Sequence, residues 1–140
     1  MIRGCRVTVR PAVLAGLLAL ALVAGAEAAT AVRVLQVIDG DTITVELQGG
    51  AIERLRIVGM DTPERGAGAR CPAEAALAER ASSHLATLLR RGAVTVETRH
   101  RDRYRRVLAV VMIAGQDVAP QMIKAAVARP YAGERRMTWC

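Results

Sequence analysis

Two pairs of carboxylates mark the ends of predicted strands in the first half of the chain. Asp39 and Asp41 stand on either side of Gly40 in "VIDGDT", and Asp61 and Glu64 enclose a Thr-Pro turn in "RLRIVGMDTPE". Carboxylates held close together raise one another's pKa unless a cation or an arginine neutralises them. Calcium, a hard cation with oxygen ligands, would meet that need. Ordinary turns are the alternative, because Asp-Gly and Asp-Thr-Pro are common turn sequences.

The segments around these acids predict a three-stranded meander. Its strands are residues 31–38, 41–47 and 51–58, which are rich in β-branched residues or alternate apolar with polar positions. In such a meander the second strand begins where the third ends, so Asp41 and Asp61 can converge. "DGD" also opens calcium-binding EF-hand loops, but the other ligands of that loop do not follow here, which excludes it.

The rest of the chain predicts a helix, two strands and a second helix. Residues 71–92 carry apolar side chains at helical spacing, with basic residues in the last turn and Gly92 as a stop. Residues 93–99 and 105–115 read as strands, and Asp117 can cap a short helix. The order predicts an α+β domain, mainly β, with mostly antiparallel pairing. Five strands with a helix after the third also match the OB-fold barrel.

The first 28 residues have the pattern of a secretory signal peptide. A basic start is followed by an apolar run and by "AEA", the small residues that a signal peptidase needs. The run is shorter than the roughly 18 to 20 residues of a membrane span, although an uncleaved anchor is the alternative. We therefore expect an exported domain over residues 29–140, periplasmic or extracellular, with no stable membrane association after cleavage.

The cysteines agree with export. Cys5 lies in the predicted signal peptide, which leaves Cys71 and Cys140 as an even pair in an oxidising compartment. Their disulfide would close a long loop and contribute roughly 4 kcal/mol in the chain-entropy model. A metal pair, disfavoured by the wide spacing and the absence of CxxC, and two free thiols are the alternatives.

Arginines supply a possible binding surface for an anion. The signal segment holds three Arg and one Glu, so its removal lowers the net charge from +7 to +5. A basic surplus favours partners such as nucleic acid. Arg56 lies on the polar face of the third strand with Arg54, and "HRDRYRRVLA" places Tyr104 among arginines. Guanidinium groups match phosphate oxygens in geometry and charge, although most charged runs are solvated surface.

Three stretches together resemble one protein family. "VIDGDTITV", "RLRIVGMDTPE" and "RDRYRRVLA", in this order and with the predicted helix before the third, are similar to the staphylococcal nuclease (thermonuclease) family of OB-fold, Ca²⁺-dependent nucleases. The resemblance covers residues 32–131. It implies hydrolysis of phosphodiester bonds in DNA and RNA, with Ca²⁺ held in a shallow groove on the barrel.

The resemblance also implies roles for individual residues. The metal would be held by Asp41, Asp61 and the backbone carbonyl of Thr62, while Asp39 would lie near it but outside its direct shell. Glu64 would be the general base that accepts a proton from the attacking water. Arg56 and Arg106 would grip the scissile phosphate. The expected substrate-binding residues are Arg103, Tyr104 and Tyr131.

Several positions depart from the family pattern. Arg105 and Ala126 stand where glycine is usual, so a left-handed backbone at Arg105 would cost about 1 kcal/mol. The long C-terminal helix of the best-known members is replaced by a short basic tail, "YAGERRMTWC". Neither His84 nor His100 matches a catalytic position, and Arg54 has no family role.

We expect an exported Ca²⁺-dependent nuclease with little sequence specificity, for which a monomer suffices. One alternative is a non-catalytic OB-fold protein that binds nucleic acid, although such domains tend to lose the acids that this chain keeps. A disulfide-stapled structural protein of the envelope is another alternative. That reading explains the signal and the cysteines but not the placement of acids and arginines.

Overall fold

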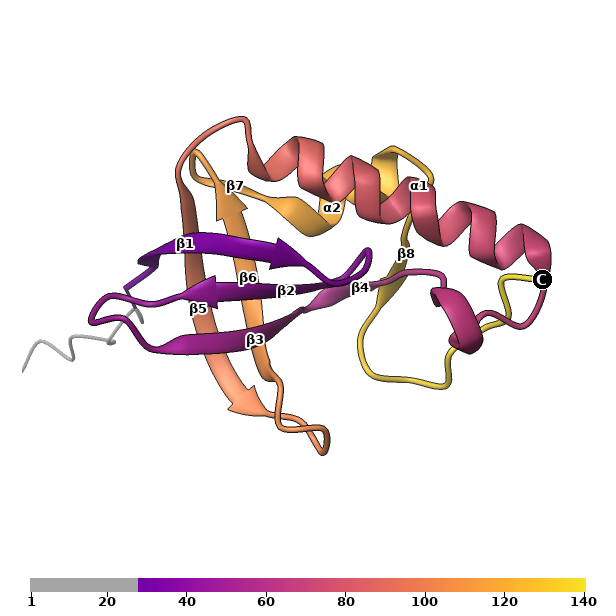
Figure 1. Ribbon diagram of the computed structural model, residues 1–140, viewed down its shortest axis with the longest axis horizontal. Coiled ribbons are helices and arrows are strands. Elements are labelled where there is room, and N and C mark those ends of the chain that lie inside the picture. Colours follow the sequence, from indigo (N-terminus) through magenta and orange to yellow (C-terminus); the bar gives the residue numbers. More distant parts are fainter. Residues whose placement is uncertain (1–27) are drawn as a thin grey trace, which may run out of the picture.

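Five strands close into a small barrel, and two helices pack against it (Figure 1). The computed structural model describes residues 28–140, so the predicted signal peptide, Cys5 included, lies outside the described residues except for its last position. The elements in chain order are β1 (Thr30–Val37), β2 (Thr42–Glu46), β3 (Ile52–Ile57), β4 (Gly59–Asp61), the 3-10 turn η1 (Gly66–Gly68), α1 (Pro72–Leu89), β5 (Val94–Arg101), β6 (Val107–Ile113), β7 (Gln116–Asp117), α2 (Val118–Lys124) and β8 (Arg129–Tyr131).

The barrel follows from alternating strands that are buried on one face. In β6 every second side chain is buried, from Val107 to Ile113, because successive residues of a strand point to opposite faces. The strands are ordered β3-β2-β1-β5-β6 with antiparallel pairing, and a parallel pairing of β3 with β6 closes the barrel. The predicted α+β, OB-type barrel is confirmed, and the parallel closure was not specified by the sequence patterns.

Helix α1 covers one end of the barrel. Cys71 caps it, with the Sγ atom accepting a hydrogen bond from the Glu74 amide, and Pro72 occupies its first turn. Ala81, Leu85 and Leu88 insert into the barrel core. The helix ends at Leu89, and Arg90 is its C-terminal cap. The prediction that basic residues occupy the last turn is therefore wrong, because they follow the last helical residue. Within residues 28–140, neither helix has the length and apolar character needed to cross a bilayer.

The chain after α2 returns to the end of β3. Asp117 caps α2 through a 2.9 Å bond from the Ala119 amide, as predicted. Ala126 adopts a left-handed φ of 58° just past the helix, where the family pattern has glycine. The following strand, β8, pairs with β4 and aligns Arg129 with Asp61. These two strands of three residues were not predicted, and they carry the C-terminal tail to the acids at the barrel mouth.

Gly40 connects the acids of this mouth to the core. A Cβ atom at Gly40 would lie 2.8 Å from the Ala81 Cβ and 2.9 Å from the Thr62 Cβ. Such distances are shorter than packed carbon atoms allow. The close approach of this turn to α1 therefore requires glycine.

We predict that Gly40→Ala lowers the free energy of unfolding by about 1 to 3 kcal/mol through overpacking. Gly92→Ala is the matched control, because its Cβ would meet neighbours at ordinary contact distances, the nearest at 3.5 Å. Urea denaturation of the two variants measures the difference. Equal stability of the two variants would contradict the close packing of α1 on this turn.

Candidate active site

A buried arginine lies between two buried aspartates at the mouth of the barrel. Asp41, Arg56 and Asp61 are 5%, 8% and 4% exposed. The β2–β3 register brings them together, because Arg56 pairs with Thr42 and the Ile57 amide donates to the Asp41 carbonyl at 2.8 Å. Arg56 Nη1 forms an ion pair with Asp41, and its Nη2 lies 3.6 Å from Asp61 Oδ1. The predicted convergence of the two aspartates is confirmed.

The environment of Asp41 favours a further positive charge. Burial raises the pKa of Asp41 to about 7, because the charge of Arg56 offsets only part of the cost of desolvation. The hydroxyls of Thr42 and Thr62 donate to its two oxygens at 3.0 and 2.9 Å. Asp39 accepts the Asp41 amide and adds a nearby negative charge. A cation at this position would stabilise the ionised form of Asp41.

The C-terminal tail also enters the site. Arg136 Nη2 lies 2.6 Å from Asp61 Oδ1 and donates to the Thr62 carbonyl at 3.1 Å, while its Nη1 lies 2.5 Å from Glu64 Oε1. Burial alone would lower the pKa of Arg136, but the hydrogen bond to Glu64 and the nearby charge of Asp61 raise it. The indole Nε1 of Trp139 donates to Asp61 Oδ2 at 3.2 Å. Sequence patterns did not indicate Arg136 or Trp139, because the tail has no periodicity.

The oxygen atoms at the mouth suit a hard metal ion. Asp41, Asp61 and the Thr62 carbonyl offer the ligand type that Ca²⁺ prefers. Asp61 Oδ1 is buried and accepts no well-aligned hydrogen bond from the described residues, although Arg136 lies close to it. No group of three or more His, Cys, Asp or Glu side chains forms a metal cluster in residues 28–140. The donor set therefore fits a metal held by two carboxylates and a carbonyl, with water or substrate completing the shell.

Arg106 is aimed into the site by Asp102. The Arg106 Nε and Nη2 atoms each lie 2.8 Å from Asp102 Oδ2, and the Arg106 amide donates to Oδ1 at 3.0 Å. Burial would raise the pKa of Asp102, but these hydrogen bonds more than offset it and lower the pKa. Arg106 Nη1 reaches Thr42 Oγ1 at 3.5 Å, beside Asp41. Asp102 is thus a positioning residue that sequence analysis missed.

The tight turn before Arg106 presents Tyr104. Arg105 has a left-handed φ of 65°, so it carries the strain that we expected for such a backbone at this position, and its amide donates to the Asp102 carbonyl at 2.9 Å. The exposed Tyr104 ring has the guanidinium carbons of Arg103 and Arg106 at 5.0 and 5.3 Å from its centroid. Cations at this range interact with the face of an aromatic ring.

A groove of about 870 Å³ runs across these residues. Its lining includes residues of the 102–106 turn and the segment from Tyr131, the last residue of β8, to Gly133. All the expected catalytic, metal-binding and substrate-binding residues line it except Asp61, which is buried. Arg54, expected to be a surface residue without a role, is exposed but also lines the groove.

Comparison with known proteins agrees with this geometry. The family model described as "staphylococcal nuclease homologue" matches residues 54–138. The chain belongs to this family. An uncharacterized endonuclease of Haemophilus influenzae is 29% identical over 99 residues, which cover 71% of this chain and 51% of the relative. The chain thus spans about half the length of that relative. The family match includes the whole turn from Arg56 to Glu64 and the tail through Arg136.

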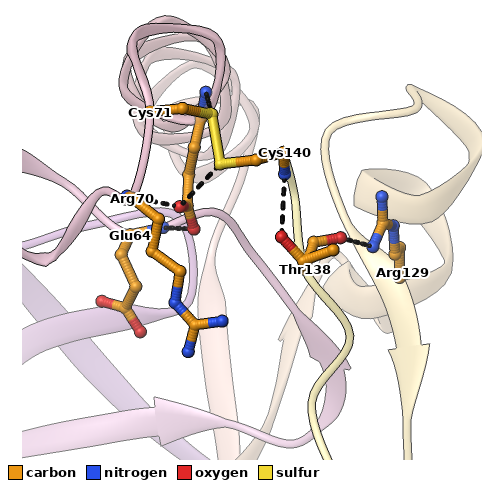
Figure 2. Close-up of a disulfide and its surroundings, with 7 residues drawn as sticks. Glu64, Arg70, Cys71, Arg129, Thr138 and Cys140 are labelled. Atoms are coloured by element: carbon orange, nitrogen blue, oxygen red, sulfur yellow. Dashed lines mark hydrogen bonds between the residues drawn. A yellow bond between two sulfur atoms is a disulfide. The ribbon is translucent and has the colours of Figure 1, made fainter.

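In this staphylococcal nuclease homologue a disulfide ties the tail to the first helix. Cys71 and Cys140 are bonded, with Cα atoms 6.1 Å apart, which confirms the predicted pair (Figure 2). Beside it the buried Glu74 carboxylate accepts the Arg70 amide at 2.7 Å and the Glu64 amide at 3.2 Å. These bonds hold the loop that carries Glu64 against α1. Glu74 was not singled out by sequence analysis.

The Glu74 carboxylate should make the stability of the fold depend on pH. The hydrogen bond from the Arg70 amide, followed by that from Glu64, lowers the pKa of Glu74 below 4.5. A lowered pKa gives stability that is present above pH 4.5 and is lost as the pH falls through the folded-state value. Glu74→Gln should therefore cost about 1 to 3 kcal/mol at pH 7, because its amide group faces a backbone donor.

This cost should shrink below the folded-state pKa, where Glu74 of the wild-type protein is itself protonated. Urea denaturation at pH 7 and at acid pH measures the difference between variant and wild type at each pH. Glu79→Gln is the control, since the Glu79 side chain is 61% exposed. A difference that did not change with pH would contradict the role of the Glu74 carboxylate.

Proposed function

We propose that this chain is an exported nuclease that uses Ca²⁺ to hydrolyse phosphodiester bonds in DNA or RNA with little sequence specificity. The observation that carries the proposal is the buried Asp41–Arg56–Asp61 arrangement, two members of which line an arginine-rich groove, in a chain of the staphylococcal nuclease family. The family is metal-dependent, and Ca²⁺ in particular is our inference from the oxygen ligands. Export follows from the predicted signal peptide, and we propose a monomer.

The two arginines are suited to a phosphodiester whose charge grows during attack. Arg56 is locked by its acids and by the Ile57 and Met60 carbonyls, to which it donates at 3.4 and 3.3 Å. Arg106 is held by Asp102 and reaches the Thr42 hydroxyl beside Asp41. Positive groups that are already oriented stabilise developing charge without reorganising. We therefore assign the grip on the scissile phosphate to this pair.

We assign to Glu64 the role of accepting a proton from the attacking water. Its side chain is 44% exposed, so water reaches it, and its amide is fixed by Glu74. As the water oxygen forms its bond to phosphorus, its proton passes to the Glu64 carboxylate and the bond to the leaving oxygen breaks. Ca²⁺ bound by Asp41, Asp61 and the Thr62 carbonyl would supply positive charge to the phosphoryl oxygens.

The groove lining supports weak sequence preference. Among the lining residues, Arg103, Tyr104 and Tyr131 can contact phosphates or stack on bases. Contacts to the phosphate backbone carry no sequence information directly, and stacking tolerates every base. A non-catalytic nucleic-acid-binding protein is the rival function, and it predicts binding without cleavage.

Metal removal tests the proposal directly. Residues 29–140 contain every described element of the fold, and we expect this fragment to degrade plasmid DNA with Ca²⁺, to stop in excess chelator and to recover when Ca²⁺ is restored. Agarose electrophoresis measures the cleavage. Activity that persisted in excess chelator would remove the metal from the proposal, and a folded but inert protein would favour the non-catalytic rival.

Glu64→Gln tests the base. We expect kcat to fall by about 10²- to 10⁴-fold, because the amide cannot accept the proton, while DNA binding is retained. Glu97→Gln, on β5 and outside the described groove lining, is the matched control and should keep full activity. Steady-state cleavage and DNA binding in Ca²⁺ separate the two effects. Near-unchanged cleavage would exclude Glu64 as the base.

A further inference from the structure

Arg136 contacts the same oxygen groups that the proposed function assigns to metal and to water. It reaches Asp61 Oδ1 at 2.6 Å, the Thr62 carbonyl at 3.1 Å and Glu64 Oε1 at 2.5 Å. Its positive charge therefore neutralises acids that would otherwise require a cation. Metal and guanidinium cannot both occupy these oxygens, because their charges repel and their ligands are shared.

Arg56 and Arg136, the two arginines that contact Asp61, differ in their exposure. The Arg56 side chain is 10% exposed and is surrounded by acids and carbonyls. The Arg136 side chain is 40% exposed, and its partner Glu64 is 44% exposed. Arg136 is therefore the more accessible of the two, and its pair with Glu64 is exposed and weak. Its pair with the buried Asp61 can be given up when another cation takes its place. Arg56 would leave two buried carboxylates behind.

The tail that carries Arg136 is held at both ends. Before it, β8 pairs with β4 and aligns Arg129 with Asp61. After it, the Cys71–Cys140 disulfide fixes the last residue to the start of α1 (Figure 2). Arg129 of β8 also contacts the far end of the tail. Its guanidinium carbon lies 3.7 Å from the Trp139 ring centroid, and its Nη1 donates to the Thr138 carbonyl at 2.7 Å. A segment anchored at both ends keeps a high local concentration of Arg136 at the acids.

We propose that Arg136 is a tethered internal cation that competes with the metal for Asp61, Thr62 and Glu64, and that the Cys71–Cys140 disulfide holds it in the competing position. This regulation of the site rests on the proposed metal-dependent function. The apparent dissociation constant of the metal is its intrinsic value divided by the fraction of molecules whose site is free of Arg136. Loss of Arg136, or release of its tether, raises that fraction.

Metal binding without substrate tests the competition. Ca²⁺ is titrated calorimetrically into residues 29–140 and into its Arg136→Gln variant, which should bind Ca²⁺ about tenfold more tightly. Arg135→Gln is the matched control, because it removes the same charge from the adjacent, exposed residue and should leave the affinity within about twofold. Equal affinities of the wild-type protein and Arg136→Gln would overturn the proposal.

The disulfide is tested in the same assay. A water-soluble phosphine reduces the S–S bond to two thiols with two electrons and two protons, and is itself oxidised to the phosphine oxide with oxygen from water. Reduction should tighten Ca²⁺ binding severalfold in the wild-type protein and change nothing in Arg136→Gln, because the two changes act through one contact. Equal tightening in both proteins would overturn the role of the tether. Circular dichroism verifies that the reduced protein is folded. If it unfolds, the calorimetric comparison of the oxidised wild-type protein with oxidised Arg136→Gln decides whether Arg136 competes with Ca²⁺.

Trp139 offers an independent readout. It is the chain's one tryptophan, and its indole donates to Asp61, a ligand of the proposed metal. Ca²⁺ should change its fluorescence with the midpoint found by calorimetry. Absence of Ca²⁺ binding in every form would overturn both the competition and the metal site. If Arg136→Gln binds Ca²⁺ more tightly than the wild-type protein but neither protein cleaves DNA, the competition is supported and only the proposed nuclease activity is contradicted.

Discussion

The site depends on one buried charge, the guanidinium of Arg56. It lies between Asp41 and Asp61, and all three side chains are removed from water. Breaking such a pair leaves an uncompensated buried charge at a cost of about 3 to 5 kcal/mol, so the three residues constrain one another. The β2–β3 register, the close turn at Gly40 and the hydroxyl of Thr62 all serve to hold this arrangement. Asp41 and Arg56 of this arrangement line the groove.

Positive charge around the acids is graded by burial. Arg56 is enclosed, Arg106 is half-buried and oriented by Asp102, and Arg136 is the most exposed and belongs to a tail rather than to the barrel. In the proposed function the two more buried arginines stabilise charge without moving, whereas Arg136 is the one that we propose to exchange with the metal. The acids do not conflict with a basic chain, because Asp41 and Asp61 each lie against an arginine in the structure.

Local pattern predicted the elements whose stabilisation is local or periodic. The alternation of β2 and β6, the spacing of α1 and the Asp117 cap each appear in the sequence because neighbouring residues create them. The strands β4 and β8 have three residues each, which is too short for a period, and they exist because a distant partner supplies their hydrogen bonds. The left-handed backbone of Arg105 was not predicted, because an arginine does not favour a positive φ; the family's glycine only marked the position where its cost would arise.

The sequence by itself determined the fold class, the candidate acids and arginines, and the cysteine pair, because strand alternation, turn residues and the resemblance are all written in short stretches of chain. Only the tertiary structure decided that β3 closes the barrel on β6, that Asp102 orients Arg106, and that Arg136 and Trp139 contact Asp61. The last of these contacts joins residues 75 or more positions apart. Such contacts depend on chain closure through β8 and the disulfide, and no local pattern encodes them.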